Sequence, residues 1–296
     1  MLPAGVLAMA ARGDGWADWV RALPDTVRDL LDEWQLTVDG SPRHGSCSLV
    51  IPVRPPSGRP AVLKTGFPDA ESEHEHLALQ HWHGKGAVQL LRADPHRSAL
   101  LLERLHEKTL TDLWDLEACE VVGRLYRRLH VPALPQLRRL SGQLVGWELQ
   151  LRRLPRSAPL PRRLVEQSAA IARDLAGDEA TDGLMLHGDL HYDNVLAADR
   201  EPWVVIDPKP LSGDPNFEPA PMLWNRWDEV VASGDVRDAV RRRFHTIIDA
   251  AGLADDRAKD FVVLRLVLNA VWELAEREPD RTWITRCITI AKAVQG

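Results

Sequence analysis

The sequence predicts an α+β protein, with a small antiparallel-sheet lobe over residues 1–105 and a larger, mainly helical lobe over residues 106–296. Two patterns carry this prediction. In the first part, short apolar runs of strand length are separated by proline, glycine and aspartate turns. In the second part, apolar residues recur at steps of three and four, which is the spacing of amphipathic helices. One hairpin interrupts the helices, so the second lobe is not purely helical.

The first lobe is expected to hold a five-stranded sheet and one internal helix after a short N-terminal helical segment. Apolar positions at helical spacing predict a helix over 24–34 that begins after Pro24. Strands are predicted at residues 36–38, 49–53, 61–64, 88–91 and 99–103. The first three should form an antiparallel meander, because only short turns join them. The segment 69–83 switches to helical spacing and should form the internal helix.

The second lobe is expected to consist of helices around one hairpin. Helical spacing is strong over residues 111–130, 161–176, 236–250 and 258–277. The hairpin is predicted from two apolar runs, 195–197 and 203–206, which flank a polar turn at 199–202. The stretch 151–163, rich in arginine, leucine and proline, is expected to be a loop or the entrance of a helix.

The amino-acid composition favours a globular protein and argues against several other classes. The chain of 296 residues is 45% hydrophobic and 27% charged, which is typical of a globular protein rather than a disordered one. A net charge of −6 argues against a general nucleic-acid binder and favours attraction of a cationic small molecule. Three scattered cysteines without a CxxC pair predict a reduced, cytoplasmic setting. The apolar run 2–11 is too short to cross a membrane, and no membrane partner is expected.

The motif most specific for chemistry is H-G-D-L-H-Y-D-N at residues 187–194. Asp189 precedes Asn194 by five residues, on a loop that leads into the predicted hairpin, and the second strand of that hairpin ends at Asp207. Because a hairpin returns the chain to its starting end, Asn194 and Asp207 should lie close together. An amide oxygen beside a carboxylate suits Mg²⁺ held against phosphates. Asp189 would then accept the proton of an attacking hydroxyl.

The segment 186–215, LHGDLHYDNVLAADREPWVVIDPKPLSGDP, resembles the aminoglycoside phosphotransferases, and most closely the group of streptomycin 6-phosphotransferases and hydroxyurea kinases. The resemblance extends to 84–91, to 100–105 and to 241–244, and covers roughly residues 30–275. It implies a two-lobe, protein-kinase-like fold, with H-G-D-x-x-x-x-N standing where protein kinases carry H-R-D-x-x-x-x-N. It also implies a phosphotransferase that uses ATP or GTP and Mg²⁺.

The resemblance assigns further roles in nucleotide binding. Lys64 would contact the α- and β-phosphates, and the alternative is a solubilising lysine on an edge strand. Its ion-pair partner would be Glu75, with Glu71 and Glu73 as rivals. The segment Gly45–Ser48, with Ser46 and Cys47 at its centre, would cover the phosphates, although it reads almost equally well as a plain hairpin turn. Glu103 to Leu105 resembles the linker whose backbone binds adenine.

The acceptor site is the hardest part to predict. Residues that follow Asp207 should border it and would suit a cationic substrate by ion pairing and cation–π contact. These candidates are Asp214, Glu218, Trp224, Trp227, Asp228 and Glu229. The alternative is an ordinary amphipathic helix with Leu223 and Trp227 inward and the acidic residues in solvent.

Three functions remain open at this stage. The first is phosphorylation of a hydroxyl of streptomycin or a related aminocyclitol, which would confer resistance. The second keeps the chemistry but has hydroxyurea, another antibiotic or a metabolic amino sugar as the acceptor. The third is an inactive nucleotide-binding sensor, which is disfavoured because Asp189, Asn194 and Asp207 are all present. Lys209 departs from the Asp-Phe-Gly of protein kinases, and its flanking prolines predict no activation-loop switch. No protein partner is implied.

Overall fold

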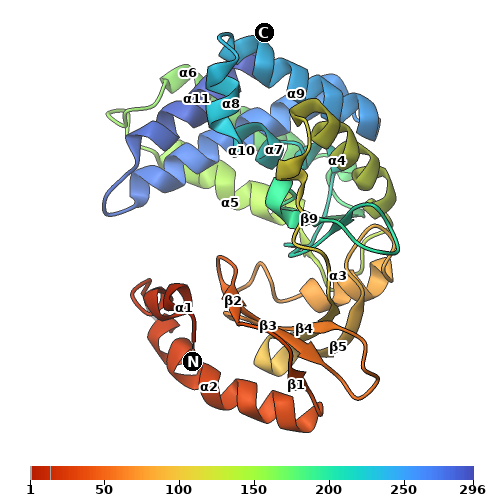
Figure 1. Cartoon of the computed structure of the whole chain (residues 1–296). Coiled ribbons are helices and arrows are strands. Elements are labelled where there is room, and N and C mark those ends of the chain that lie inside the picture. The colour runs from red at the N-terminus through yellow and green to blue at the C-terminus, as the bar shows by residue number, and fades with distance from the viewer. Residues whose placement is uncertain (1, 14) are drawn as a thin grey trace. The chain divides into compact units, whose positions relative to one another are not determined.

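The computed structural model describes residues 2–13 and 15–296 and divides into two compact units. The first unit comprises residues 1–106 together with 198–200, and the second comprises residues 107–197 and 201–296. Figure 1 shows the helices and strands that each unit contains. The large sheet lies in the first unit and most of the helices lie in the second, as the α+β prediction requires.

The first unit is built on one antiparallel sheet with the strand order β1-β3-β4-β6-β5, in which β2 pairs with β3. Its strands are β1 (Thr37–Val38), β2 (Arg43–His44), β3 (Ser48–Arg54), β4 (Ala61–Gly66), β5 (Leu90–Asp94) and β6 (Ala99–Glu103). The predicted antiparallel meander is confirmed by β1, β3 and β4. The short strand β2 was not predicted, because two residues are too few to show a period.

The strand expected at 88–91 forms later, at Leu90–Asp94. Its pairing with β6 is irregular between Leu90 and Arg92, where the register shifts. The carboxylate of Asp94 accepts a hydrogen bond from the amide of Arg97 at 3.1 Å. This bond closes the turn into β6 and lets the strand continue to Asp94, which pairs with Ala99.

The helices of the first unit also differ at their ends from the expected spans. The helices are α1 (Ala4–Met9), α2 (Trp16–Glu33) and α3 (Glu75–Trp82). The helix expected to follow Pro24 instead begins at Trp16 and contains that proline. Buried side chains keep helical spacing on both sides of Pro24, so packing outweighs the lost N–H. The internal helix begins at Glu75 rather than 69, because Asp69 accepts the amides of the two residues that follow Ala70 and forms a turn.

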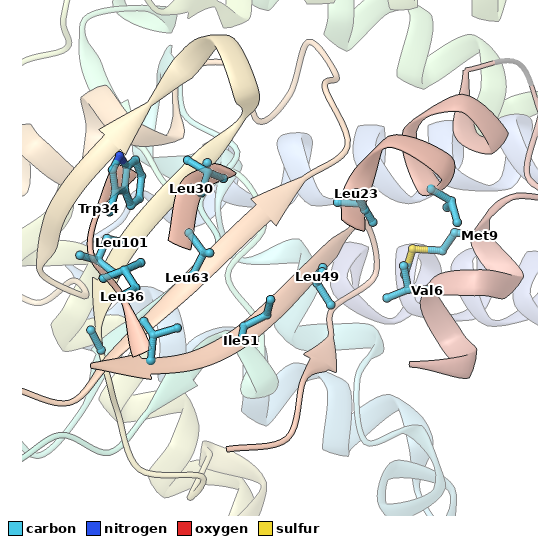
Figure 2. Close-up of a cluster of buried hydrophobic side chains, with 14 residues drawn as sticks. Val6, Met9, Leu23, Leu30, Trp34, Leu36, Leu49, Ile51, Leu63 and Leu101 are labelled. Atoms are coloured by element: carbon cyan, nitrogen blue, oxygen red, sulfur yellow. The ribbon is translucent and has the colours of Figure 1, made fainter. Parts of the chain in front are cut away.

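The core of the first unit lies between α1, α2 and one face of the sheet. Figure 2 shows Val6 and Met9 of α1 and Leu23 and Leu30 of α2 in the same buried cluster as the strand residue Leu49. Ile51, Leu63 and Leu101 extend the cluster across β3, β4 and β6. The two N-terminal helices are therefore part of the unit's hydrophobic core.

The second unit is mainly helical. Its α-helices are α4 (Asp115–Leu129), α5 (Leu140–Arg153), α6 (Arg162–Ala176), α7 (Ala220–Trp224), α8 (Trp227–Ala232), α9 (Val236–Ala251), α10 (Asp255–Ala275) and α11 (Arg281–Gln295). Its strands are β7 (Arg138–Arg139), β8 (Leu184–Leu186), β9 (Val195–Leu196), β10 (Val204–Val205) and β11 (Leu211–Gly213). Helix α10 buries side chains around most of its circumference, so it forms the centre of this unit.

The four predicted helical runs and the hairpin are confirmed in the second unit. Strands β9 and β10 pair antiparallel, with Val195 opposite Val205. Helices α5 and α11 and the three-stranded sheet β7-β11-β8 were not predicted. The stretch 151–163 contains the end of α5, a loop and the start of α6. Across residues 2–13 and 15–296, no helix has the length and apolar character that crossing a membrane requires.

We predict that Leu30→Ala destabilises the first unit by about 2–5 kcal/mol, because it leaves a cavity in the core beneath the sheet. Leu30 is fully buried, whereas Leu7 on α1 is 53% exposed. Leu7→Ala is the matched control and should change the free energy of unfolding by less than about 0.5 kcal/mol. Denaturant titration followed by circular dichroism measures both. Equal effects of the two substitutions would contradict this packing.

Candidate active site

The first unit contains a buried ion pair between β4 and α3. Lys64 Nζ lies 2.7 Å from both carboxylate oxygens of Glu75. The two side chains are 11% and 7% exposed, whereas Glu71 and Glu73 are exposed. Strand β4 lies between β3 and β6, so the alternative of an edge-strand lysine is wrong. The ammonium group is thus held in a fixed position on a central strand.

The segment Gly45–Ser48 connects β2 to β3, so it is a hairpin turn whatever else it does. The amide of Gly45 donates to the carbonyl of Ser48 at 3.0 Å, and the carbonyl of Cys47 accepts the amide of Phe67 at 2.8 Å. Arg12 donates to the carbonyl of Ser46. Ser46 is exposed, which keeps its backbone and hydroxyl accessible.

Glu103, at the end of β6, uses its side chain within the first unit. Its carboxylate accepts hydrogen bonds from Arg200 Nη2 at 2.7 Å and from the amide of Gln89 at 2.8 Å. Arg200 also donates to the carbonyls of Gly84 and Ala87. Only the backbone of Glu103 to Leu105 is therefore suited to contact a base.

In the second unit, the hairpin brings the predicted Asn194 and Asp207 together. The amide of Ile206 donates to the carbonyl of Asn194 at 2.9 Å, which continues the pairing of β9 with β10 up to the residue before Asp207. Asn194 Nδ2 donates to the carbonyl of Asp189 at 2.8 Å. This bond ties the amide group to the backbone of Asp189 and turns its oxygen away from that carbonyl.

Asp207 has a left-handed backbone, with φ of 56°, which is uncommon for a residue other than glycine. Such a conformation persists only where the surrounding structure holds it, and it clusters at functional sites. Its carboxylate is partly exposed, and Lys209 Nζ lies 3.4 Å from Oδ1.

The oxygen donors of this hairpin suit Mg²⁺. Mg²⁺ takes one or two protein oxygens and completes its coordination with phosphates and water. Asn194 and Asp207 are one amide and one carboxylate of this kind. Within the part of the chain that the structure describes, no cluster of three or more histidine, cysteine, aspartate or glutamate side chains forms a metal cage.

The loop that carries Asp189 is held from behind by Glu218. This carboxylate is fully buried and accepts the amides of His187 at 2.6 Å and Gly188 at 3.0 Å. Arg265 Nη2 donates to the carbonyl of Gly188 at 2.9 Å. Gly188 has φ of 82°, and a Cβ there would lie 2.3 Å from the carbonyl oxygen of Lys209. A side chain at this position would therefore push the loop away from the segment that follows Asp207.

Burial and neighbouring groups shift the pKa values of His187 and Glu218. Burial of His187 lowers its pKa, so the ring is neutral near pH 7. Its Nε2 donates to the carbonyl of Ile206 at 2.9 Å, which leaves Nδ1 to accept the amide of Asp189 at 3.4 Å. Burial raises the pKa of Glu218, but interaction with His130 and with His187 outweighs it and lowers the pKa below its usual value. Glu218 is therefore ionised.

A second anchor of the loop was missed in the sequence. Tyr192 donates from its hydroxyl to Asp115 Oδ1 at 2.6 Å, and Arg243 Nε donates to Oδ2 of the same carboxylate at 2.7 Å. Arg243 is fully buried on α9. The available signal was an arginine at a position of α9 where helical spacing calls for an apolar residue.

The expected acceptor residues do not share one surface. Asp214 is buried and pairs with Arg257, and Glu218 is buried behind the catalytic loop. Neither carboxylate has access to an acceptor, so neither is kept as a substrate contact. Trp224 is half-buried and packs edge-to-face on Trp283 at 5.9 Å, whereas Asp228 is exposed on α8.

Comparison with known proteins gives a consistent set of relatives. The sequence pattern of the family described as aminoglycoside/hydroxyurea antibiotic resistance kinase matches residues 33–276. The chain is 41% identical to streptomycin 6-kinase of Streptomyces glaucescens, over 100% of this chain and 97% of the relative. It is 38% identical to hydroxyurea phosphotransferase of Kitasatospora aureofaciens, over 94% of this chain and 81% of that protein.

Solved structures agree on the fold. An aminoglycoside phosphotransferase in complex with ADP and hygromycin B is similar with a TM-score of 0.60 at 15% identity, covering 91% of this chain and 98% of that one. Choline kinase of Streptococcus pneumoniae gives 0.59 at 11% identity, covering 92% and 99%. These likenesses confirm the protein-kinase-like fold.

We predict that Glu218→Gln lowers the free energy of unfolding by about 1–3 kcal/mol, because an amide cannot accept both backbone N–H groups and leaves one buried donor unsatisfied. Glu166→Gln, on the exposed face of α6, is the control and should have almost no effect. Denaturant titration gives the stabilities, and hydrogen exchange at the amides of His187 and Gly188 should quicken in the Glu218 variant alone. Unchanged exchange would contradict the anchor.

A second prediction concerns pH. The pKa of buried His187 is lowered in the folded protein, whereas an unfolded histidine titrates near pH 6.5. As the pH falls below about 6.5, the unfolded chain takes up a proton that the folded ring refuses, so stability falls by up to about 1.4 kcal/mol per pH unit. His187→Gln should flatten this slope of unfolding free energy against pH, and exposed His96→Gln should not. Equal slopes in both variants would show that His187 does not titrate this way.

Proposed function

We propose, since the chain belongs to the aminoglycoside/hydroxyurea antibiotic resistance kinase family, that it transfers the γ-phosphoryl group of ATP to a hydroxyl of a small cationic antibiotic, with streptomycin or a related aminocyclitol as the acceptor. The observation that carries the proposal is the hairpin geometry. Asn194 donates a hydrogen bond to the backbone of Asp189, and the pairing of β9 with β10 continues to Ile206, the residue before Asp207.

In this proposal, the roles in nucleotide binding are assigned residue by residue. Asn194 and Asp207 would hold Mg²⁺, which supplies positive charge to the phosphates when it is bound. Lys64, fixed by Glu75, would contact the α- and β-phosphates. Backbone N–H groups around Ser46 and Cys47 would bind phosphate oxygens, and the backbone of Glu103 to Leu105 would bind the base. GTP is the alternative donor.

Asp189 would act as the base. Its carboxylate accepts the proton of the acceptor hydroxyl as that oxygen attacks the γ-phosphorus in line. The new bond joins the acceptor oxygen to phosphorus, and the bond from phosphorus to the bridging β,γ-oxygen breaks to release ADP. Glu218 and Tyr192 position the loop for this step, because they anchor it on both sides of Asp189. Positioning of this kind supplies much of the rate acceleration.

The chemistry of the acceptor supports a resistance role. A net charge of −6 favours a cationic antibiotic. A phosphate adds about −1.5 to −2 charges at pH 7, which would weaken binding of such an antibiotic to RNA phosphates. Two relatives named streptomycin 6-kinase are 41% and 39% identical to the chain, and the hydroxyurea phosphotransferase is 38% identical. Hydroxyurea or a metabolic amino sugar is therefore the alternative acceptor. We place the reaction in the cytoplasm, where ATP is made, and propose no protein or nucleic-acid partner.

The deciding experiment incubates the purified chain with Mg-ATP or Mg-GTP and one acceptor at a time: streptomycin, other aminoglycosides, hydroxyurea and simple amino sugars. Mass spectrometry identifies the phosphorylated product. Phosphorylation of streptomycin supports the full proposal, and turnover of another acceptor replaces only the acceptor. Bound nucleotide with no product from any acceptor would favour the nucleotide-binding sensor.

Three variants test the roles of the carboxylates. Asp189→Asn should lower kcat by about 10²–10⁴-fold with little change in nucleotide affinity. Asp207→Ala should abolish turnover while the protein stays folded, because a metal ligand is lost. Asp193→Asn, an exposed residue of the same loop, is the matched control and should keep wild-type activity. Full activity in Asp207→Ala would exclude the metal role, and lost nucleotide binding in Asp189→Asn would exclude the base.

A further inference from the structure

Lys209 lies at a position where its backbone is fixed against the catalytic loop. Its amide donates to the carbonyl of His187 at 2.7 Å, and its own carbonyl packs so closely on Gly188 that only glycine fits there. Pro208 and Pro210 are buried on either side and restrict the backbone further. The root of the lysine side chain therefore has a defined position relative to the two residues that precede Asp189.

The side chain of Lys209, in contrast, is held loosely. Its Nζ lies 3.4 Å from one oxygen of Asp207, and the two side chains are 20% and 33% exposed. Lys64, in contrast, is held firmly: its Nζ lies 2.7 Å from both carboxylate oxygens of Glu75, and its side chain is only 11% exposed. The contact of Lys209 is long, one-sided and partly hydrated, so little energy opposes its displacement.

We propose that Lys209 is a second catalytic cation, which contacts the phosphoryl group during its transfer. This inference rests on the proposed function. In the structure, the ammonium group of Lys209 is a neighbour of the Asp207 carboxylate. A divalent ion would bind the same carboxylate and would repel the ammonium group of Lys209. The ammonium group would then contact the phosphoryl oxygens.

The negative charge that develops during phosphoryl transfer is what the Lys209 cation would stabilise. The γ-phosphorus leaves the bridging oxygen of ADP and bonds to the acceptor oxygen, whose proton passes to Asp189. Negative charge is spread over the phosphoryl oxygens and the leaving oxygen while this happens. An ammonium group on a proline-restricted backbone beside the catalytic loop stabilises that charge without a large rearrangement. Lys209 itself neither gains nor loses a proton.

The test uses Lys209→Met, which keeps an unbranched side chain and removes the charge, and Lys209→Arg, which keeps the charge. Lys259→Met is the matched control, because Lys259 pairs with Asp255 on the exposed part of α10. The main readout needs no acceptor: it is the affinity for ADP with aluminium fluoride, a mimic of the transferring phosphoryl group, relative to ADP alone. Binding of Mn²⁺, followed by its electron paramagnetic resonance signal, is the second readout.

Lys209→Met should bind ADP with wild-type affinity but lose the preference for aluminium fluoride by about 10²–10³-fold, the loss typical of one removed transition-state donor. Lys209→Arg should restore part of that preference, and Lys259→Met should lose none of it. Mn²⁺ should bind Lys209→Met more tightly than wild type, because a competing cation next to Asp207 is gone. With an acceptor, kcat should fall in parallel with the lost preference.

An unchanged preference in Lys209→Met would overturn the inference, and so would weaker Mn²⁺ binding, which would make Lys209 a support of the metal site. Failure of the proposed function looks different. In that case wild type binds the nucleotide mimic but phosphorylates no acceptor, and Lys209 is still judged by the ratio of the two affinities. A wild type without any preference for the mimic would overturn the inference as well.

Discussion

The loop that carries Asp189 depends on the hydrogen bonds from two backbone amides to the buried carboxylate of Glu218. An ionised carboxylate in the interior is stable only where charged partners or donors surround it, and here the donors are the loop itself. The loop and the carboxylate thus stabilise each other, and neither arrangement would persist alone. Arg265 on α10 donates to the carbonyl of Gly188, and the Tyr126 hydroxyl on α4 donates to the backbone carbonyl of Glu218.

The two units differ in how their charged side chains are held. In the first unit, Lys64 and Glu75 form a buried pair, and the loss of one partner from such a pair typically destabilises a protein by about 3–5 kcal/mol. In the second, the carboxylate of Asp207 is 33% exposed and lies 3.4 Å from the ammonium group of Lys209. One arrangement sets a fixed cation in place, and the other keeps an anion accessible.

Local pattern was enough to predict the elements that position the site, namely the meander, the four strongest helices and the hairpin. The pairing of Lys64 with Glu75 was implied by the family resemblance, and Glu75 was favoured over its rivals because it shares a helix face with Leu79 and Trp82. What could not be predicted depends on contacts between distant residues. Pro24 lies inside a helix because the packed face of α2 outweighs its missing donor, and Glu218 turned inward because the loop amides require an acceptor. Both reasons depend on contacts between residues far apart in the sequence, which a local pattern does not reveal.

The proline on each side of Lys209 has a consequence for how such an enzyme is controlled. Two buried prolines restrict the backbone after Asp207, so this segment offers little freedom that a modification or an effector could use. Under the proposed function, activity would follow the number of protein copies and the supply of ATP. For a cell that uses the protein as protection, tolerance of the drug would rise with gene dosage.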